Sequence, residues 1–188
     1  MAALPEQSHM TVEEYFELCR NNPDVRYEYI DGQVTMLAGG SLNHARIAAS
    51  IIGVLRNLLR GGPCEPFTSD AALQVTASRY VLPDVAVTCD ERDHQDNDYL
   101  QYPCLLFEVL SPTTESADRG RKFAYYRNIP TIREYVLVNS LEVSVELFRR
   151  EKSTLWTLHL FGFDDEITLA SIGATLSVRE IYENVVFS

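Results

Sequence analysis

The sequence of 188 residues predicts an α/β fold in which helices flank a mixed β-sheet. A continuous apolar run, "CLLFEVL" at 104–110, precedes a helical segment and a second β-rich run, "IREYVLVNS" at 132–140. This order is typical of a parallel βαβ crossover. Asp31-Gly32, between alternating apolar and polar runs, predicts an antiparallel hairpin. Residues 41–60 carry an apolar stripe at helical spacing and predict the main core helix.

The other elements follow in chain order. Thr11 lies three residues before Glu14 and matches a capping box, which predicts a first helix ending near Arg20. The runs "DAALQVT" and "RYVLPDVAVTCD" predict two strands, and the acidic stretch "DERDHQDND" predicts a solvated loop. A helix is expected at about 116–127. The C-terminal part predicts further short strands and a final short helix, "VREIYENV".

Length and local patterns indicate one soluble domain covering residues 1–188. No apolar run approaches the ~20 residues of a membrane span, and the N-terminus "MAALPEQSHM" lacks the features of a secretory signal. The four cysteines are widely spaced and form no C-x-x-C pair, so we expect reduced thiols in a cytoplasmic protein.

The net charge of −11 disfavours tight, non-specific nucleic-acid binding, which depends on neutralising phosphates with Lys and Arg. Any nucleic-acid role therefore has to be local or metal-assisted.

Two acids stand at comparable places on neighbouring β-runs, Asp84 in "YVLPDVAV" and Glu108 in "LLFEVLSP". Burying an ionised carboxylate is costly unless it is paired or holds a metal, so we expect the two acids to share a cation. Oxygen ligands favour Mg²⁺ or Mn²⁺, and the absence of a close His or Cys in the motifs disfavours zinc.

Lys122 lies on the helix that follows the Glu108 strand, and it can reach back toward both acids. Its charge there would orient a water or stabilise a phosphoryl oxygen. The alternative is that each acid points outward at a strand end and pairs with an arginine, and that Lys122 is a solvated helix charge.

The order of these motifs resembles the Uma family of bacterial endonucleases, which belongs to the PD-(D/E)XK, restriction-endonuclease-like superfamily. The motifs are "PD" at 83–84, "EVLSP" at 108–112, "DRGRKFAYY" at 118–126 and "IREYVLV" at 132–138. The similarity begins at "TVEEYFEL" and continues through "YEYIDG" and "NHARIAASI". It implies a restriction-endonuclease-like core with additional N- and C-terminal β-strands.

The resemblance implies that Asp84 and Glu108 bind the metal, with the backbone carbonyl of Val109 as a further ligand. The superfamily's lysine normally lies two residues after the second acid, where this sequence has Leu110. In the Uma pattern Lys122 takes over that role. Glu28 in "YEYIDG" matches an N-terminal acid that adds a ligand or pairs with the lysine, and otherwise it is an ordinary cross-strand polar residue.

Other residues are weaker candidates. Asp70 is a further acid of the same kind as Glu28, and His44 is a candidate phosphate contact or else a capping or core residue. Tyr125 and Tyr126 are expected to pack. Four arginines form either a positive rim for DNA or a solvated helix face: Arg119, Arg121, Arg127 and Arg133.

These features together indicate a Mg²⁺-dependent DNA endonuclease, for which Mn²⁺ can substitute. The superfamily implies 5′-phosphate products and a homodimer. One alternative is a catalytically silent nuclease-like domain that serves as a protein-interaction module, as Leu110 and the acidic charge suggest. A carbohydrate-active enzyme with Asp84 and Glu108 as acid and base is another, but it gives Lys122 no role.

Overall fold

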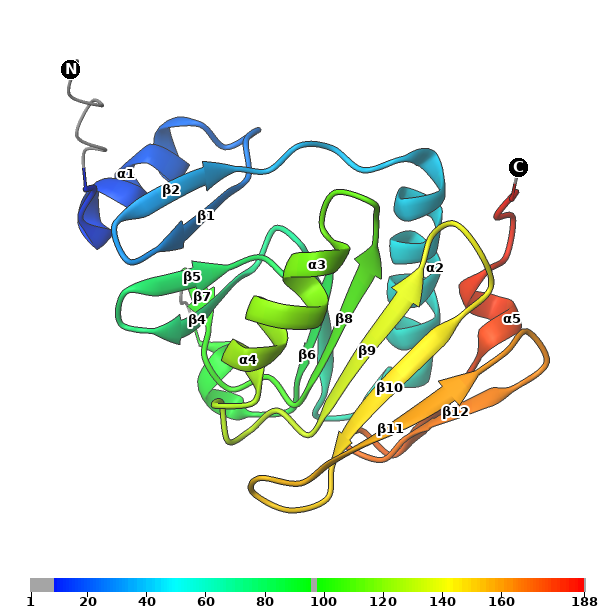
Figure 1. The fold of residues 1–188 in the computed structure, drawn as a ribbon. Coiled ribbons are helices and arrows are strands. Elements are labelled where there is room, and N and C mark those ends of the chain that lie inside the picture. The colour runs from blue at the N-terminus through cyan, green and yellow to red at the C-terminus, as the bar shows by residue number, and fades with distance from the viewer. Residues whose placement is uncertain (1–8, 96–97, 188) are drawn as a thin grey trace.

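The computed structural model describes residues 9–95 and 98–187 and contains three sets of paired strands with five α-helical segments (Figure 1). The helices are α1 (Val12–Asn21), α2 (Leu42–Leu58), α3 (Glu115–Ala117), α4 (Phe123–Tyr126) and α5 (Val178–Ile181). The strands are β1 (Tyr27–Ile30), β2 (Gln33–Met36), β3 (Glu65–Thr68), β4 (Ala72–Thr76), β5 (Arg79–Val81), β6 (Val85–Thr88), β7 (Tyr99–Leu100), β8 (Leu105–Leu110), β9 (Glu134–Asn139), β10 (Val145–Arg150), β11 (Trp156–Phe161), β12 (Glu166–Leu169) and β13 (Ala174–Ser177). Within the described ranges, no helix has both the length and the apolar character to cross a bilayer.

The central sheet has the strand order β11-β10-β9-β8-β6-β3. Strands β8 and β9 run parallel, and the other neighbouring pairs of this sheet run antiparallel. A second sheet has the order β2-β1-β5-β4-β7, and β12 pairs with β13 as a separate hairpin. The predicted α/β class, the mixed sheet and the crossover between residues 105 and 139 are therefore confirmed.

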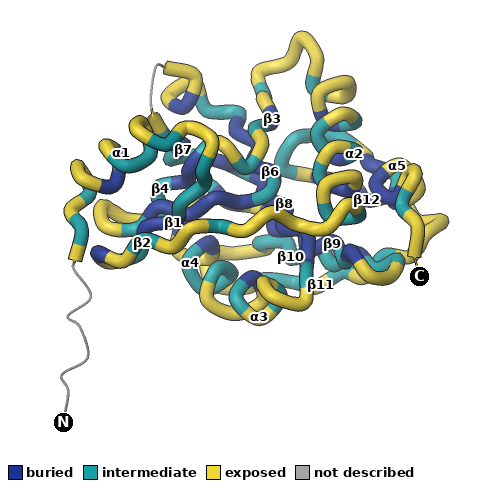
Figure 2. The backbone as a smooth tube through the Cα atoms, turned by 90° about the horizontal axis from the view of Figure 1, so that it is seen from above, coloured by how far each residue is buried: buried dark blue, intermediate teal, exposed yellow. Residues whose placement is uncertain are grey.

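Helices cover both faces of the central sheet (Figure 1). The apolar side of α2 packs on one face, and the segment from α3 to α4 crosses the other face. Strand β8 is buried along its whole length and lies in the interior of the molecule (Figure 2). Its alternate residues divide between the two layers: Leu105, Phe107 and Val109 belong to the α2 side, and Leu106 and Leu110 to the crossover side.

The structure confirms two predictions of local structure. Thr11 and Glu14 form the capping box at the start of α1, with reciprocal bonds of 3.2 and 2.7 Å between backbone N–H groups and side chains. The hairpin β1-β2 turns at Asp31 and Gly32, which both have positive φ. Such a turn favours Asp and Gly because other residues adopt this backbone conformation at a cost.

The run "RYVLPDVAVTCD" is not one strand. It divides at Leu82, Pro83 and Asp84 into β5, which belongs to the second sheet, and β6, which belongs to the central sheet. Strand β3 was not predicted, because Pro66 lies inside it, and proline is tolerated in β3 since this strand is at the edge of its sheet. The acidic loop contains a 3₁₀ turn at Glu91–His94, and its residues 96–97 lie outside the described residues.

The expectation of four reduced thiols is wrong for two cysteines, since Cys64 and Cys89 form a disulfide. Strand β3, which was not predicted, brings these two cysteines together. The antiparallel register of β3 and β6 sets Glu65 opposite Thr88, so the residues just outside this pair, Cys64 and Cys89, lie opposite each other. Cys19 and Cys104 are free.

Replacing Cys89 with serine should lower the free energy of unfolding by about 3 kcal/mol, because the disulfide restricts the unfolded chain. The bridge joins residues 25 apart in sequence. Cys89 is the better position to change because its Sγ also lies 3.6 Å from Cys104 Sγ, so a Cys64 variant would leave two neighbouring thiols. Urea unfolding without reductant measures the change. A Cys19→Ser control with the same midpoint as the Cys89→Ser variant would contradict the prediction.

Candidate active site

Glu108 points toward the crossover because of strand alternation. It lies between Phe107 and Val109, which face α2, and shares the opposite face with Leu106 and Leu110. Only 2% of the residue is exposed. A buried carboxylate requires partners on that face, and the chain between β8 and β9 provides them.

Asp84 lies where the chain passes from the second sheet to the central sheet. The pair Val85↔Phe107 aligns β6 with β8, and continuing this register by one residue sets Asp84 opposite Glu108. Asp84 Oδ2 accepts a 2.7 Å hydrogen bond from the backbone N–H of Val109 and lies 3.2 Å from His44 Nε2. The orientation of the Asp84 side chain is thus fixed from β8 on one side and from α2 on the other.

Lys122 extends from the crossover back toward β8. Its Nζ donates a 3.0 Å hydrogen bond to Glu108 Oε1. The same ammonium lies 3.4 Å from Glu28 Oε1 on β1 and 3.4 Å from Asp118 Oδ1. One cation therefore contacts carboxylates from three separate parts of the chain.

The sequence did not single out two members of this cluster. Tyr126 was expected to pack, and it does, but its hydroxyl also donates a 2.8 Å hydrogen bond to Glu108 Oε1. Asp118 was not considered, and it is 2% exposed. Its spacing of four residues from Lys122 was the available signal, but it required knowledge that this helical face turns inward.

The electrostatics of the cluster follow from burial. Burial raises the pKa of the Glu108 carboxyl to about 8; Lys122 opposes this rise, and the negative charges of Asp84 and Asp118 add to it. Burial alone would lower the pKa of the Lys122 ammonium, but Glu108, Glu28 and Asp118 outweigh it and hold that pKa above its usual value. Lys122 is therefore a cation at neutral pH.

The hydrogen bond to Asp84 raises the pKa of His44, against the opposing effect of burial. Solvent reaches the cluster at His44, Asp84 and Lys122. The exposed fractions of these side chains are 19%, 16% and 12%, against 3% for Glu108. A ligand would approach the cluster past these three residues.

Asp70, a weaker candidate, is not part of this cluster. It is exposed, accepts a 3.0 Å hydrogen bond from Thr68, and lines a pocket of about 470 Å³ with Asp93 and His94. A second pocket, of about 420 Å³, is lined by Arg56, Arg60 and neighbouring residues. Neither pocket is lined by Asp84, Glu108 or Lys122.

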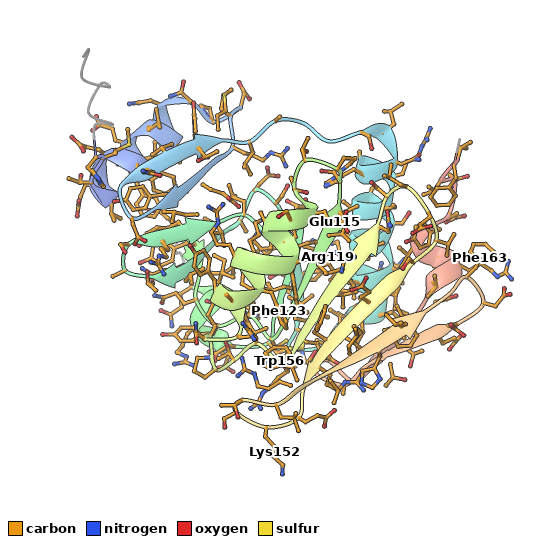
Figure 3. The ribbon with its side chains drawn as sticks, viewed as in Figure 1. Glu115, Arg119, Phe123, Lys152, Trp156 and Phe163 are labelled. Atoms are coloured by element: carbon orange, nitrogen blue, oxygen red, sulfur yellow. A yellow bond between two sulfur atoms is a disulfide. The ribbon has the colours of Figure 1, made fainter. Side chains whose placement is uncertain are left out.

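The four arginines have different surroundings. Arg119 is held by two acids, with hydrogen bonds of 2.7 Å to Glu115 and of 2.6 and 2.8 Å to Glu146. Figure 3 shows Glu115 and Arg119 on neighbouring turns of the crossover. Arg127 lies over the Phe123 ring, while Arg121 and Arg133 are exposed. Arg121 remains the arginine nearest in sequence to Lys122 that is open to a ligand.

The cluster has more acids than bases: Glu28, Asp84, Glu108 and Asp118 against Lys122 and His44. Its oxygen donors, its excess negative charge and the buried Asp118 Oδ1, which has no hydrogen-bond partner among the described residues, suit a hard divalent cation. In the described part of the chain, no three His, Cys, Asp or Glu side chains converge as a metal-binding group. A magnesium site needs no such group, because Mg²⁺ is commonly held by one or two carboxylates with water.

Comparison with known proteins identifies the relatives of this chain. Two proteins of Synechocystis, each described as "Uncharacterized protein", are 40% identical over 163 residues and 33% identical over 144 residues. The first alignment covers 86% of this chain and 86% of the relative, and the second covers 74% and 81%.

A crystal structure from Anabaena variabilis, described as "a putative nuclease belonging to DUF820", matches with a TM-score of 0.74 over 94% of this chain and 99% of that one. At 16% identity this match concerns the fold. The sequence pattern of the Uma2 family, described as "Putative restriction endonuclease", matches residues 12–179. The chain therefore belongs to the Uma2 family and has a nuclease-like fold.

Proposed function

We propose that this protein is a metal-dependent endonuclease that hydrolyses DNA phosphodiester bonds at the cluster of Asp84, Glu108 and Lys122. The observation that carries the proposal is the 3.0 Å contact between Lys122 Nζ and Glu108 Oε1. Leu110 stands where the superfamily's lysine would be, and a lysine from the crossover nevertheless reaches the second acid. Family membership and the nuclease-like fold support the same conclusion.

Asp84, Glu108 and the backbone carbonyl of Val109 would hold Mg²⁺, with Mn²⁺ as a substitute, and Glu28 is a further candidate ligand. When bound, the cation would supply a water of lowered pKa and neutralise negative charge on the scissile phosphate. The contacts of Asp84 with the Val109 N–H and His44 keep its carboxylate oriented toward the open side of the site.

Lys122 has a defined role in this proposal because its surroundings keep it protonated. An ammonium donates hydrogen bonds and accepts none, so it would orient the attacking water or stabilise the phosphoryl oxygens and would not remove a proton. Tyr126 fixes the Glu108 oxygen that Lys122 contacts. The two side chains thus define where the carboxylate and the positive charge lie.

DNA binding is expected to be weak and sensitive to salt, because Arg119 is already paired and the net charge is −11. Arg121 and His44 are the proposed phosphate contacts. We further propose a homodimer, which would bring two sites to the two strands. Linear plasmid formed without accumulation of nicked plasmid would support paired cleavage, and nicked plasmid alone would contradict it.

Cleavage of supercoiled plasmid in Mg²⁺ or Mn²⁺ tests the function. Asp84→Ala, Glu108→Ala and Lys122→Met should each reduce the rate by about 100-fold or more. The matched control is Lys152→Met, because Lys152 is the other lysine of the chain and lies exposed in the turn between β10 and β11 (Figure 3). Products that ligase can rejoin would support 5′-phosphate ends. Equal activity in all preparations would indicate a contaminant and refute the assignment.

The second candidate function is a catalytically silent interaction module. It is favoured by the engagement of Glu108 with both Lys122 and Tyr126 and by the pairing of Arg119 with acids. Absence of both cleavage and Mn²⁺ binding in the wild-type protein would favour this function over the nuclease.

A further inference from the structure

Asp118 occupies an unusual place in the crossover. The segment Asp118–Lys122 is a π-helical turn inserted between α3 and α4, where the sequence predicts one regular helix. A single π-helical turn is a rare, locally unfavourable arrangement that occurs frequently at functional sites. Here Asp118 and Lys122, its first and last residues, contact each other across the turn, and the Asp118 carbonyl accepts a hydrogen bond from the buried Tyr135 hydroxyl.

The carboxylate of Asp118 differs from the other acids of the cluster in its bonding. Glu108 accepts hydrogen bonds from Lys122 and Tyr126, and Asp84 accepts one from Val109. Asp118 Oδ1 is buried and, among the described residues, accepts none, although Lys122 Nζ lies 3.4 Å away. A buried acceptor that accepts no hydrogen bond is destabilising, so its retention beside an ammonium calls for an explanation.

The proposed metal site provides the explanation, and this inference rests on that proposed function. Glu108 Oε1 cannot be fully available to a divalent cation while it accepts the hydrogen bond from Lys122. If Glu108 turns toward the cation, the ammonium needs another acceptor close by. Glu28 Oε1 and Asp118 Oδ1 both lie 3.4 Å from the ammonium. Glu28 Oε1 already accepts a 3.2 Å hydrogen bond from the Leu82 N–H, whereas Asp118 Oδ1 accepts none from the described residues and gains more from a new donor.

We propose that Asp118 is a positioning residue, which accepts the Lys122 ammonium when Glu108 is engaged by the divalent cation. Asp118 thereby frees Glu108 for the cation and keeps Lys122 beside it. Its negative charge also contributes to the excess of acids over bases that a cation would offset. Asp118 acts through Lys122 and touches neither the substrate nor the reacting atoms.

The test is Asp118→Asn in the full chain, with Mn²⁺ binding measured by titration calorimetry. Asparagine keeps the size of the side chain and removes its charge. We expect Mn²⁺ affinity to fall about tenfold, within the range found when groups behind a metal ligand are changed. The thermal midpoint of the metal-free protein should stay equal or rise, because the cluster holds more acids than bases and Asp118 Oδ1 accepts no hydrogen bond from the described residues. The Mg²⁺ concentration for half-maximal plasmid cleavage should rise in parallel.

The matched control is Glu115→Gln, which neutralises an acid one turn earlier that contacts Arg119 and not Lys122. It should bind Mn²⁺ as the wild type does. Unchanged Mn²⁺ affinity in Asp118→Asn would overturn the inference, as would a loss of affinity matched by a loss of metal-free stability, which is the result of a purely structural role.

The two proposals fail differently. Suppose that the wild type binds Mn²⁺ and that Glu108→Gln abolishes this binding. If Asp118→Asn then binds Mn²⁺ with the wild-type affinity, only the positioning role is refuted. If the wild type binds no Mn²⁺ at the cluster, the metal-dependent function and the positioning role are both refuted.

Discussion

Replacing Lys122 with methionine should lower the free energy of unfolding at pH 8 by about 3 to 5 kcal/mol, because removing one partner leaves buried charge uncompensated. The lysine is the cation that contacts Glu28, Glu108 and Asp118, three residues each less than 10% exposed. Methionine preserves the length of the side chain and removes its charge. Equilibrium unfolding in urea measures the difference.

The deficit should shrink as the pH is lowered from about 10 toward 7. In the folded wild type the pKa of Glu108 is raised from 4.5 to about 8, and loss of Lys122 removes the interaction that opposes this rise, so the pKa of Glu108 is higher still in the folded variant. In this range the folded variant binds more protons than the folded wild type, so protonation of Glu108 offsets part of the lost ion pair as the pH falls, and at lower pH Glu108 is protonated in both proteins and the deficit levels off. The free energy of unfolding of the Lys152→Met control should equal that of the wild type within about 0.5 kcal/mol. A Lys122→Met variant as stable as this control would show that the ammonium does not compensate the buried acids.

Replacing Glu134 with alanine should also destabilise the protein by about 3 to 5 kcal/mol, because it breaks a buried ionic network. Glu134 begins β9 and is 1% exposed. It accepts a 2.9 Å hydrogen bond from Arg149 Nε, bonds of 3.1 and 2.9 Å from the N–H groups of Ala170 and Ser171, and a further bond from the Ser171 hydroxyl. Glu134 thus fastens the turn between β12 and β13 to the central sheet.

The two buried glutamates of β8 and β9 should be distinguishable by experiment. Glu134 accepts hydrogen bonds at both carboxylate oxygens and lies opposite Leu105, three positions along the parallel pair from Glu108. Glu134→Ala should therefore lose stability and keep its Mn²⁺ affinity at a temperature at which it is folded. The control is Glu166→Ala, which changes an exposed acid of β12. The prediction fails if the two variants unfold at the same urea concentration.

Local signals in the sequence predicted much of the fold. Thr11 with Glu14 and Asp31 with Gly32 act within a few residues, so their capping box and hairpin turn can be recognised without tertiary contacts. Strand β3 was missed because its pattern contains Pro66 and its pairing partner β6 lies about twenty residues later. The disulfide between Cys64 and Cys89 was missed for the same reason.

The candidate site shows the same division. Asp84 and Glu108 stand out in the sequence because each is a charge inside an apolar run, and the structure brings both together with Glu28, His44 and Lys122. Asp118 and Tyr126 do not stand out, because a charged residue and a tyrosine are ordinary in a helix. The π-helical turn decides which of their neighbours they meet, and no local pattern reports it.

The sequence by itself determined the class of fold and the strand that carries Glu108, and its resemblance to the Uma family pointed to Lys122. The first two features depend on periodicity, turn chemistry and the cost of a charge in an apolar strand, which are local properties. Only the tertiary structure decided that Lys122 meets three acids, that Arg119 is bound by Glu146 and that Asp118 Oδ1 accepts no hydrogen bond from the described residues. Those contacts join residues from different sheets and helices, and their geometry depends on how the whole chain packs.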